Sequence, residues 1–345
     1  MKFNRICVLG GNGFVGSVVV QMLAAQGRYV RVLTRNRDRA KALTVLPTVD
    51  VVEVDIHDQV ELNRQFEGMD AVINLVGVLH EIRHGRTDKP SARRGDFHEN
   101  HVELPRKILH ACAENGIQRV LHMSALGADP VSLSAYQRSK GVGEALMLES
   151  GMPPSDNERW YLDGPKFVHG YGLQTTIFRP SVIFGRGDSF LTMFAKLVKL
   201  LPIIPLANAG ARFQPVWVED VAKSFVDALD NTATYGVTYN VCGPKVYTLQ
   251  ELVGLVADTL GKKPRVIPLC TKLSYLQAFA MEYVPGKKLM TRDDHFAMQV
   301  DNVCNNQYSL PPKLQPAPLE AIVPEYLNGA TPRGRYTAFR HHAGR

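Results

Sequence analysis

The chain has 345 residues, of which 45% are apolar and 21% are charged, and its formal net charge is +7. This is the composition of a globular protein, and the sequence contains no run of about 18 uncharged apolar residues that could span a bilayer. The most apolar stretch, residues 191–206, is interrupted by Lys196 and Lys199 and predicts a buried or interfacial helix. Because the first apolar run is too short for a secretory signal, we expect a cytoplasmic protein.

Five cysteines are scattered along the chain, and none belongs to a C-x-x-C pair. Their odd number and wide spacing favour neither a disulfide framework nor a zinc site, and no metal site is predicted. We expect most of these side chains to be reduced and to lie in the core. The cysteines are Cys7, Cys112, Cys242, Cys270 and Cys304.

The positive charge is concentrated in two segments, residues 83–94 and the basic tail at residues 329–345. Clusters of this composition are typical of solvated loops and tails, and attraction to anionic lipid headgroups is the alternative. Neither segment places stacking aromatic residues between its basic residues on a regular element, so nucleic acid is not an expected partner.

In chain order, the first expected element is a short buried strand, residues 6–9, which leads into a glycine-rich turn and a helix over residues 17–26. Gly10 permits the tight turn, Gly13 lets the backbone approach a pyrophosphate, and Gly16 lets the helix pack close to the strand. The negative charge of the ligand would then face free N–H groups at the helix N-terminus. The turn therefore predicts a dinucleotide-binding site.

Strands and helices alternate along the rest of the chain. The expected strands cover residues 29–33, 49–54, 71–75, 119–123, 175–179 and 238–242. The expected helices cover residues 39–46, 60–66, 103–115, 190–201, 218–229 and 249–260. This alternation predicts an α/β fold, a doubly wound parallel Rossmann sheet with helices on both faces and a smaller, discontinuous C-terminal lobe.

The domain boundaries are expected where this alternation is interrupted. The predicted Rossmann domain comprises residues 1–184 and 214–242, the lobe for a substrate or partner comprises residues 185–213 and 243–328, and the basic tail follows at residues 329–345. Two irregular insertions, residues 79–96 and 151–172, interrupt the Rossmann pattern. Long loops of this kind either border a binding site or are disordered.

The end of the second strand distinguishes NAD from NADP in dinucleotide sites, through an acidic side chain on the ribose or a cationic one on the extra phosphate. Here Arg35 and Arg37 follow the strand, and no carboxylate precedes Asp38. A guanidinium suits a phosphate dianion, so we expect NADP(H), with NAD(H) as the alternative. Asp55, after the third strand, accepts a hydrogen bond from the adenine amino group or caps a helix; the sequence leaves both open.

Tyr136 and Lys140 form a Y-x-x-x-K pattern after the fifth strand. On a helix this spacing puts the phenol and the ammonium on one face, where the positive charge favours the phenolate and makes Tyr136 a usable general acid/base. Two amphipathic residues on a helix surface would give the same pattern. The position of the pair after a glycine-marked sheet favours the catalytic interpretation.

Together these motifs resemble those of short-chain dehydrogenases/reductases of the extended or atypical type, the NAD-dependent epimerase/dehydratase-like branch. The matching segments are residues 10–16, 55–58, 68–77, 136–140, 179–185 and 215–222. Within this superfamily, residues 74–77, 138–144 and 291–293 resemble bacterial relatives of the NADPH-binding accessory subunit of respiratory complex I. That group also resembles proteins associated with ubiquinone synthesis.

The resemblance implies that Tyr136 and Lys140 are the catalytic pair, that Lys140 also holds the nicotinamide ribose, and that Ser124 is the orienting hydroxyl. Extended members carry a second hydroxyl directly after this serine and this chain does not, so Ser132 and Ser134 are alternatives, and a loop-stabilising role for Ser124 stays open. The implied cofactor-binding residues are Gly10, Asn12, Gly13, Phe14, Val15, Gly16, Arg35, Arg37, Asp55, Ile56, Leu75, Val76, Gly77, Tyr136, Lys140 and Pro180. Residues 179–185 and 217–220 would surround the substrate, unless Asp220 caps the helix that follows it.

Two functions follow. The first is an NADP(H)-dependent oxidoreductase or epimerase-like enzyme that acts on a small-molecule carbonyl or hydroxyl substrate, quinones included, with Tyr136 moving the proton on the substrate oxygen. The alternative is a non-catalytic NADP(H)-binding accessory or assembly factor for a respiratory or ubiquinone-synthesis complex, peripheral on the cytoplasmic face of the inner membrane. Apolar residues 191–206 and 273–283 and the basic tail motivate this alternative, although covering the sheet would also explain the apolar stretches.

Overall fold

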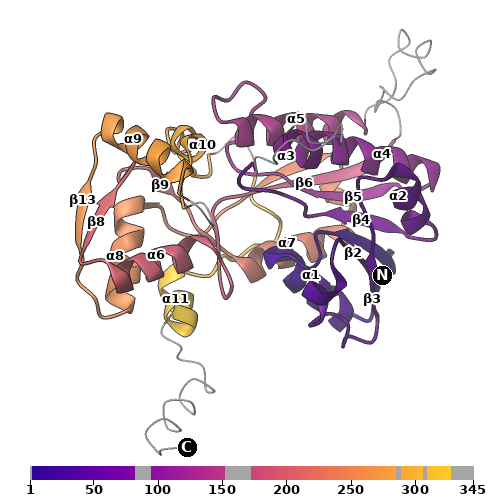
Figure 1. Cartoon of the computed structure of the whole chain (residues 1–345). Coiled ribbons are helices and arrows are strands. Elements are labelled where there is room, and N and C mark those ends of the chain that lie inside the picture. The colour runs from indigo at the N-terminus through magenta and orange to yellow at the C-terminus, as the bar shows by residue number, and fades with distance from the viewer. Residues whose placement is uncertain (1, 82–94, 152–171, 285–288, 306–308, 328–345) are drawn as a thin grey trace, which may run out of the picture. The chain divides into compact units, whose positions relative to one another are not determined.

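The computed structural model describes residues 2–81, 95–151, 172–284, 289–305 and 309–327 (Figure 1). The chain forms two compact units. The first unit comprises Met1–Pro180, Val221–Asn240 and Asn306–Pro312, and the second comprises Ser181–Asp220, Val241–Asn305 and Lys313–Arg345. The predicted basic tail lies outside the described residues, as does most of each predicted insertion.

The first unit is built on a seven-stranded sheet with the strand order β11-β6-β5-β4-β1-β2-β3. The strands are β1 (Arg5–Leu9), β2 (Tyr29–Thr34), β3 (Val49–Glu53), β4 (Ala71–Asn74), β5 (Arg119–Met123), β6 (Gln174–Pro180) and β11 (Val237–Val241). The pairs from β3 through β6 are parallel. The strand order therefore reverses beside β1, which is where doubly wound sheets bind their ligands. The predicted α/β Rossmann fold is confirmed.

Helices cover both faces of this sheet because its strands are apolar on both sides. Figure 1 shows α4 (Leu104–Glu114) and α5 (Ala135–Glu149) on one face, and α1 (Phe14–Ala25) and α7 (Val218–Leu229) on the other. On the first of these faces α4 packs between α2 (Gln59–Phe66) and α5. The core there is fully buried and includes Leu62, Phe66, Leu104, Ile108 and Met147.

Two predicted elements of the first unit are corrected. The helix expected over residues 39–46 is wrong: the chain forms only a short 3₁₀ helix, η1 (Arg37–Ala40), followed by turns. Bonds from Leu43 N to the Ala40 carbonyl and from Leu46 N to the Leu43 carbonyl close tight turns in place of α-helical ones. The helix expected from residue 103 begins earlier, with α3 (Asp96–His98) and a π-helical segment, η3 (Glu99–Glu103), running into α4.

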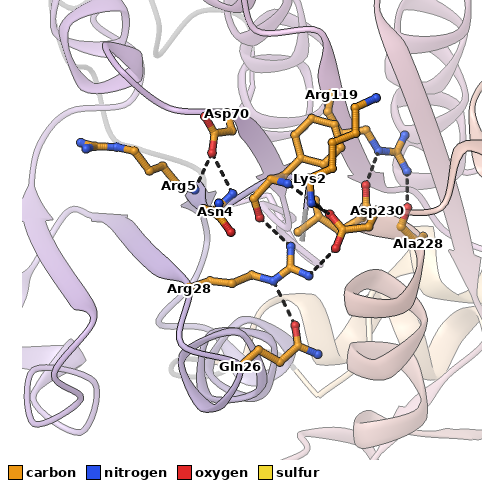
Figure 2. A network of polar contacts seen from close by, with 11 residues as sticks. Lys2, Asn4, Arg5, Gln26, Arg28, Asp70, Arg119, Ala228 and Asp230 are labelled. Carbon is orange, nitrogen blue, oxygen red and sulfur yellow. Dashed lines mark hydrogen bonds and ion pairs between the residues drawn. The ribbon is translucent and has the colours of Figure 1, made fainter.

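A polar network closes the edge of the sheet where the parallel strands begin (Figure 2). Asp230 accepts the backbone N–H groups of Lys2 and Phe3 and pairs with Arg28, whose Nη2 lies 2.8 Å from the carboxylate. Arg119, fully buried at the start of β5, donates to the carbonyls of Ala228, Leu229 and Gln174, and burial lowers its pKa to about 10. Ion pairs and arginine hydrogen bonds thus stabilise this edge. The predicted site residues lie at the opposite edge, where the strands end.

The second unit has short strand pairs and five helices among its described residues. Its elements are β7 (Ile183–Phe184), α6 (Phe190–Leu200), β8 (Ile203–Leu206), β9 (Arg212–Phe213), β10 (Val216–Trp217), β12 (Tyr247–Thr248), α8 (Leu249–Thr259), β13 (Arg265–Pro268), α9 (Thr271–Glu282), α10 (Arg292–Ala297) and α11 (Leu319–Leu327). The predicted apolar helix 191–206 is therefore a helix to Leu200 and then a strand. None of the helices in the described residues combines the length and apolar character needed to span a bilayer.

One cysteine expectation is wrong, because Cys242 and Cys304 form a disulfide with their Cα atoms 6.2 Å apart. The fold brings residues 302–304 beside Gln214, whose backbone N–H donates to the Asn302 carbonyl and whose side-chain oxygen accepts from Cys304 N. The sequence separation of 62 residues gave no sign of this approach. Cys7 and Cys112 are free and buried as expected, whereas Cys270 is free and exposed.

Candidate active site

The glycine turn between β1 and α1 is shaped by close backbone contacts. Gly10 has a φ of +76°, and a Cβ there would lie 3.0 Å from the Leu75 carbonyl carbon. A Cβ on Gly16 would lie 2.1 Å from the Gly10 carbonyl oxygen, far inside contact distance. The Gly13 N–H donates to that same carbonyl at 3.0 Å. Gly10 and Gly16 are therefore required by the turn itself, and the turn folds back on the start of α1.

The turn fits a dinucleotide pyrophosphate. Gly13 is the N-cap of α1 and supplies no side chain to the helix, and the first turn, which begins with Phe14 and the buried Val15, contains no acidic residue. No cap side chain therefore accepts a hydrogen bond from the N–H groups of the first helical turn. Free N–H groups at a helix N-terminus are the arrangement that binds a phosphate group.

At the end of β2 the buried Thr34 organises the neighbouring loop. Asn12 donates to its hydroxyl at 3.0 Å, and that hydroxyl donates to the Asn36 carbonyl at 3.1 Å. Arg35 and Arg37 follow on the surface, and Arg37 is held by its backbone N–H, which donates to Glu53 at 2.9 Å. Within the described residues neither guanidinium has a hydrogen-bond or ion-pair partner, so both can reach an anionic group.

The segment after β3 contains two carboxylates, Asp55 and Asp58, which have different roles in the structure. Asp58 is the N-cap of α2 and accepts the N–H groups of Val60 and Glu61. Asp55 accepts the N–H of His57 at 3.0 Å and is exposed, while Ile56 between them is buried. The capping role left open for Asp55 belongs to Asp58, and the carboxylate of Asp55 remains at the surface of the site.

The loop after β4 carries the predicted residues Leu75, Val76 and Gly77. The buried Asn74 shapes it: its side-chain oxygen accepts the Val76 N–H at 3.1 Å, and its amide donates to Nδ1 of His122 at 3.1 Å. Burial, and then the nearby Lys140, lower the pKa of His122 to about 3. Both partners are thus neutral, and the loop leaves β4 in a fixed direction with Gly77 exposed.

Lys140 connects this loop to the end of β5. Its ammonium donates to the Met123 carbonyl at 3.0 Å and to the Val76 carbonyl at 3.4 Å. A Cβ on Gly77 would lie 3.2 Å from Lys140 Nζ. The side chain is buried, and burial lowers its pKa to about 8 although Glu144 acts in the opposite direction. A lysine of this kind carries a charge near neutral pH but can lose it at mildly alkaline pH.

Tyr136 lies one turn before Lys140 on α5, near the N-terminal end of that helix. Ser134 caps the helix by accepting the N–H of Gln137. The half-buried ring of Tyr136 makes edge contacts with Phe97 and His101, at centroid distances of 5.9 and 5.6 Å. These contacts fix the ring on the face of α5 that also carries Lys140.

Ser124 has a partner that the sequence analysis did not foresee. Its hydroxyl donates to Glu144 at 2.7 Å, and Glu144 is also bound by Arg179 through Nη2 at 2.6 Å and through Nε at 2.9 Å. Glu144 is one turn beyond Lys140 on α5. The structure therefore gives Ser124 a place in a buried ionic group, and Pro180 lies beside it, where its carbonyl accepts the N–H of Leu126 at 3.0 Å.

The alternative serines also have structural partners. Ser134 is the cap of α5, and Ser132 donates to the side chain of Gln137 at 2.8 Å. Asp220, predicted beside the substrate or as a cap, lies in the first turn of α7 and accepts the N–H of Ala317 at 2.8 Å.

A family profile described as NAD(P)H-binding matches residues 10–184, just over half of the chain. The chain belongs to this NAD(P)H-binding family. It is 27% identical over 343 residues to the Arabidopsis thaliana protein named NADH dehydrogenase [ubiquinone] 1 alpha subcomplex subunit 9, mitochondrial, with 93% of this chain and 78% of that protein covered. The mouse protein of the same name is 32% identical over 252 residues, which cover 71% of this chain and 58% of the mouse protein. The chain thus spans less than two thirds of the mouse relative.

Solved structures of other proteins confirm the fold. A nucleoside-diphosphate-sugar epimerase from Staphylococcus aureus superposes with a TM-score of 0.68 at 16% identity, with 93% of this chain and all of that chain covered. At the level of the fold, the predicted resemblance to the epimerase/dehydratase-like proteins is confirmed. The matched residues include the glycine turn, and the family is described as NAD(P)H-binding.

Most of the predicted cofactor residues of this family member meet at one edge of the sheet, since parallel strands end on the same side. Sequence reasoning missed the buried polar residues that support them, namely Asn74, His101, His122 and Glu144. Glu144 extends the four-residue spacing of Tyr136 and Lys140 by one more turn, which was a usable signal. No local pattern marks the two histidines, because their partners come from other strands and helices.

Proposed function

We propose that the chain is an NADP(H)-dependent oxidoreductase that acts on a carbonyl or hydroxyl group, with Tyr136 and Lys140 as its catalytic residues. The observation that carries this proposal is the position of Lys140: a buried ammonium, held by the Met123 and Val76 carbonyls, one helical turn from Tyr136. Burial of an ammonium costs free energy even when hydrogen bonds compensate part of that cost. Here the charge lies on the same helix face as the phenol of Tyr136.

The preference for NADP(H) is supported by the surface after β2. Arg35 and Arg37 are exposed there, and the carboxylate nearest to them along the chain, Asp38, pairs with Lys41 at 3.1 Å. Glu53 is already bound to the backbone of Arg37. An arginine pair with this freedom suits the extra phosphate of NADP, whereas binding of NAD at this position is usually supported by a carboxylate.

In the proposed reaction the cofactor, Tyr136, Lys140 and Ser124 have different roles. Bound NADP(H) supplies or accepts the hydride. Tyr136 gives a proton to the substrate oxygen in reduction, or removes it in oxidation. Lys140 favours the phenolate form of Tyr136 and donates to the ribose hydroxyls. Ser124 takes part only if its hydroxyl turns from Glu144 to the substrate oxygen.

Turnover is tested with purified protein, NADPH and a panel of carbonyl compounds and quinones. The wild type is expected to oxidise NADPH with at least one of them, and Tyr136→Phe to reduce the rate by about 10²- to 10⁴-fold. Tyr29→Phe, at the opposite edge of the sheet, is the matched control and is expected to keep the rate. An inactive wild type, or a Tyr136→Phe variant as fast as the wild type, contradicts the proposal.

A second function, an accessory subunit of a quinone-handling respiratory complex, is supported by the surface of α9. This helix buries its small residues Ser274 and Ala278 and exposes 51% of Leu273 and 58% of Leu276. Tyr283, directly after the helix, is 66% exposed. Exposed apolar side chains in a group are typical of an interaction surface. The names of the Arabidopsis and mouse relatives point to the same kind of assembly.

This second function is tested by fractionation of cells under mild conditions. The chain is expected to co-migrate with a respiratory complex, and Leu276→Glu to release it. Val45→Glu, which changes an exposed apolar residue of the first unit, is the control. A protein absent from every respiratory or quinone-synthesis complex at low salt contradicts this function.

A further inference from the structure

His101 lies next to Tyr136 and Lys140, and its ring contacts both the loop after β4 and helix α5. None of the motifs found in the sequence contains it. It belongs to η3, a π-helical segment of five residues between α3 and α4. Such wide turns are uncommon and gather at functional sites, because they rotate a side chain away from the regular helical position. His101 is buried, with 2% of its surface exposed.

A glycine on α5 permits this approach. A Cβ on Gly143 would lie 1.9 Å from the His101 carbonyl oxygen. The backbone of η3 therefore lies directly against α5, and the imidazole extends toward the first turn of that helix. The ring stacks on Phe97 at a centroid distance of 5.6 Å and meets the edge of Tyr136 at the same distance.

The hydrogen bonds of the ring assign its tautomer. The backbone N–H of Val78 donates to Nε2 at 3.1 Å, so Nε2 carries no proton. Nδ1 must then carry the proton, and it lies 2.9 Å from the hydroxyl of Ser139. That hydroxyl in turn donates to the backbone carbonyl of Tyr136 at 2.9 Å. One chain of bonds thus runs from the loop after β4 to the backbone of the proposed acid/base.

We infer that His101 is a positioning residue of the site: as the neutral Nδ1–H tautomer it fixes the Val76–Val78 loop against the first turn of α5. Lys140 holds the Val76 carbonyl of this loop and His101 holds the Val78 N–H, so two adjacent parts of the loop are tied to the same helix region. The inference rests on the proposed function, because Val76 and Gly77 of this loop are among the predicted cofactor-binding residues.

The surroundings keep His101 neutral. A proton on Nε2 would face the Val78 N–H and would add a second positive charge near the ammonium of Lys140. Burial, then Lys140 and His122, lower the pKa of His101 to about 2. The ring therefore acts as a fixed connector and does not exchange protons during turnover.

The tautomer is tested by long-range ¹H–¹⁵N correlation spectra of histidine-labelled protein, with His101 assigned from the signal lost in His101→Gln. We expect a protonated Nδ1, an unprotonated Nε2 and no titration between about pH 5 and pH 9. His122 is an internal reference, because it accepts from Asn74 at Nδ1 and must have the opposite tautomer. An Nε2–H tautomer or a titrating ring at His101 overturns the inference.

The positioning role is tested by NADPH affinity in variants that keep one half of the ring's bonds. His101→Gln retains an acceptor where Nε2 lies, and is expected to bind NADPH within about 3-fold of the wild type. His101→Asn retains only a donor near Nδ1, and His101→Leu retains neither; both are expected to bind about 10-fold more weakly. Thermal unfolding of the ligand-free variants is measured alongside.

The outcomes separate two failures. If the wild type binds no nicotinamide dinucleotide, the proposed function fails and this inference fails with it. If the wild type binds NADPH and the three variants bind it equally well, or if their affinities only follow their unfolding temperatures, the role of His101 alone is overturned. Rescue by glutamine but not by asparagine supports it.

Discussion

Arg179 binds Glu144 in a bidentate ion pair, with Nη2 2.6 Å and Nε 2.9 Å from the same carboxylate oxygen, Oε1. The side chain of Glu144 is 3% exposed and that of Arg179 is 16% exposed. The pair joins the end of β6 to α5. Its carboxylate lies one helical turn after Lys140 and accepts the hydroxyl of Ser124. The pair therefore supports the helix that carries both proposed catalytic residues.

Removal of one partner of this pair is expected to destabilise the protein. Arg179→Ala leaves the buried carboxylate of Glu144 without its cation, which typically costs about 3–5 kcal/mol in the free energy of unfolding. Chemical denaturation measures this loss. Arg64→Ala removes an exposed arginine 3.6 Å from Glu61 and serves as the control, with an expected change of at most about 0.5 kcal/mol. A similar effect of the two variants would show that the buried pair is not important for stability.

The activity is expected to have an alkaline limit set by Lys140. Burial lowers its pKa from 10.5 to about 8, so above pH 8 the folded protein loses a charge that the unfolded chain still keeps. Between these two values the unfolded state binds more protons, and the contribution of Lys140 to stability rises with pH. The support of the Tyr136 phenolate is lost over the same range.

Turnover measured against pH is therefore expected to fall as pH rises through about 8, without a parallel fall in unfolding temperature caused by Lys140. Lys107→Met, which removes a lysine bound to the His57 carbonyl, is the control and should keep the same alkaline limit. A rate that is constant across this range would show that the charge of Lys140 is not needed.

The glycine turn is expected to tolerate no side chain at Gly16. Gly16→Ala places a Cβ 2.1 Å from the Gly10 carbonyl oxygen, so the turn must open, and we expect loss of dinucleotide binding and a clear loss of stability. Gly254→Ala, on α8 with open space around the new Cβ, is the control and is expected to stabilise by about 0.5–1 kcal/mol. Calorimetry and NADPH titration measure both effects, and unchanged binding by Gly16→Ala would exclude the turn as the cofactor cradle.

The polar network at the opposite edge of the sheet is expected to affect stability alone. Asp230→Ala removes the acceptor of two backbone N–H groups and the partner of Arg28, for an expected loss of about 2 kcal/mol. The affinity for NADPH should stay unchanged below the unfolding transition, because the network lies where the strands begin. A weaker affinity in the folded variant would contradict this separation of the two edges.

The sequence predicted the glycine turn and several strands and helices of the first unit well because their signals are local. The glycine spacing follows from backbone contacts within one turn, and the spacing of Tyr136 and Lys140 follows from one helix. The expected strand over residues 119–123 and the expected helix over residues 218–229 match β5 and α7 residue for residue. The strand is a short run rich in apolar residues, and the helix repeats its apolar residues at helical spacing. In each case the determining contacts lie within a few residues of one another.

The failures have a common physical cause, which is dependence on distant parts of the chain. Residues 39–46 contain good helix formers, but Ala40 and Leu43 are their main buried anchors and the chain turns into β3. Ser124 finds its partner 20 residues away, and Cys242 meets Cys304 only through the fold around Gln214. Asp58, and not Asp55, is the cap because α2 begins at Gln59, the residue directly after Asp58.

The preference of the purified protein for NADPH or NADH is measured by calorimetric titration of the wild type and Arg35→Ala with both dinucleotides. We expect the wild type to bind NADPH about 10-fold or more tightly than NADH, and Arg35→Ala to lose most of this preference while its affinity for NADH stays the same. Equal or tighter binding of NADH by the wild type would contradict the assignment of NADP(H), and no binding of either dinucleotide would contradict the account of the site as a whole.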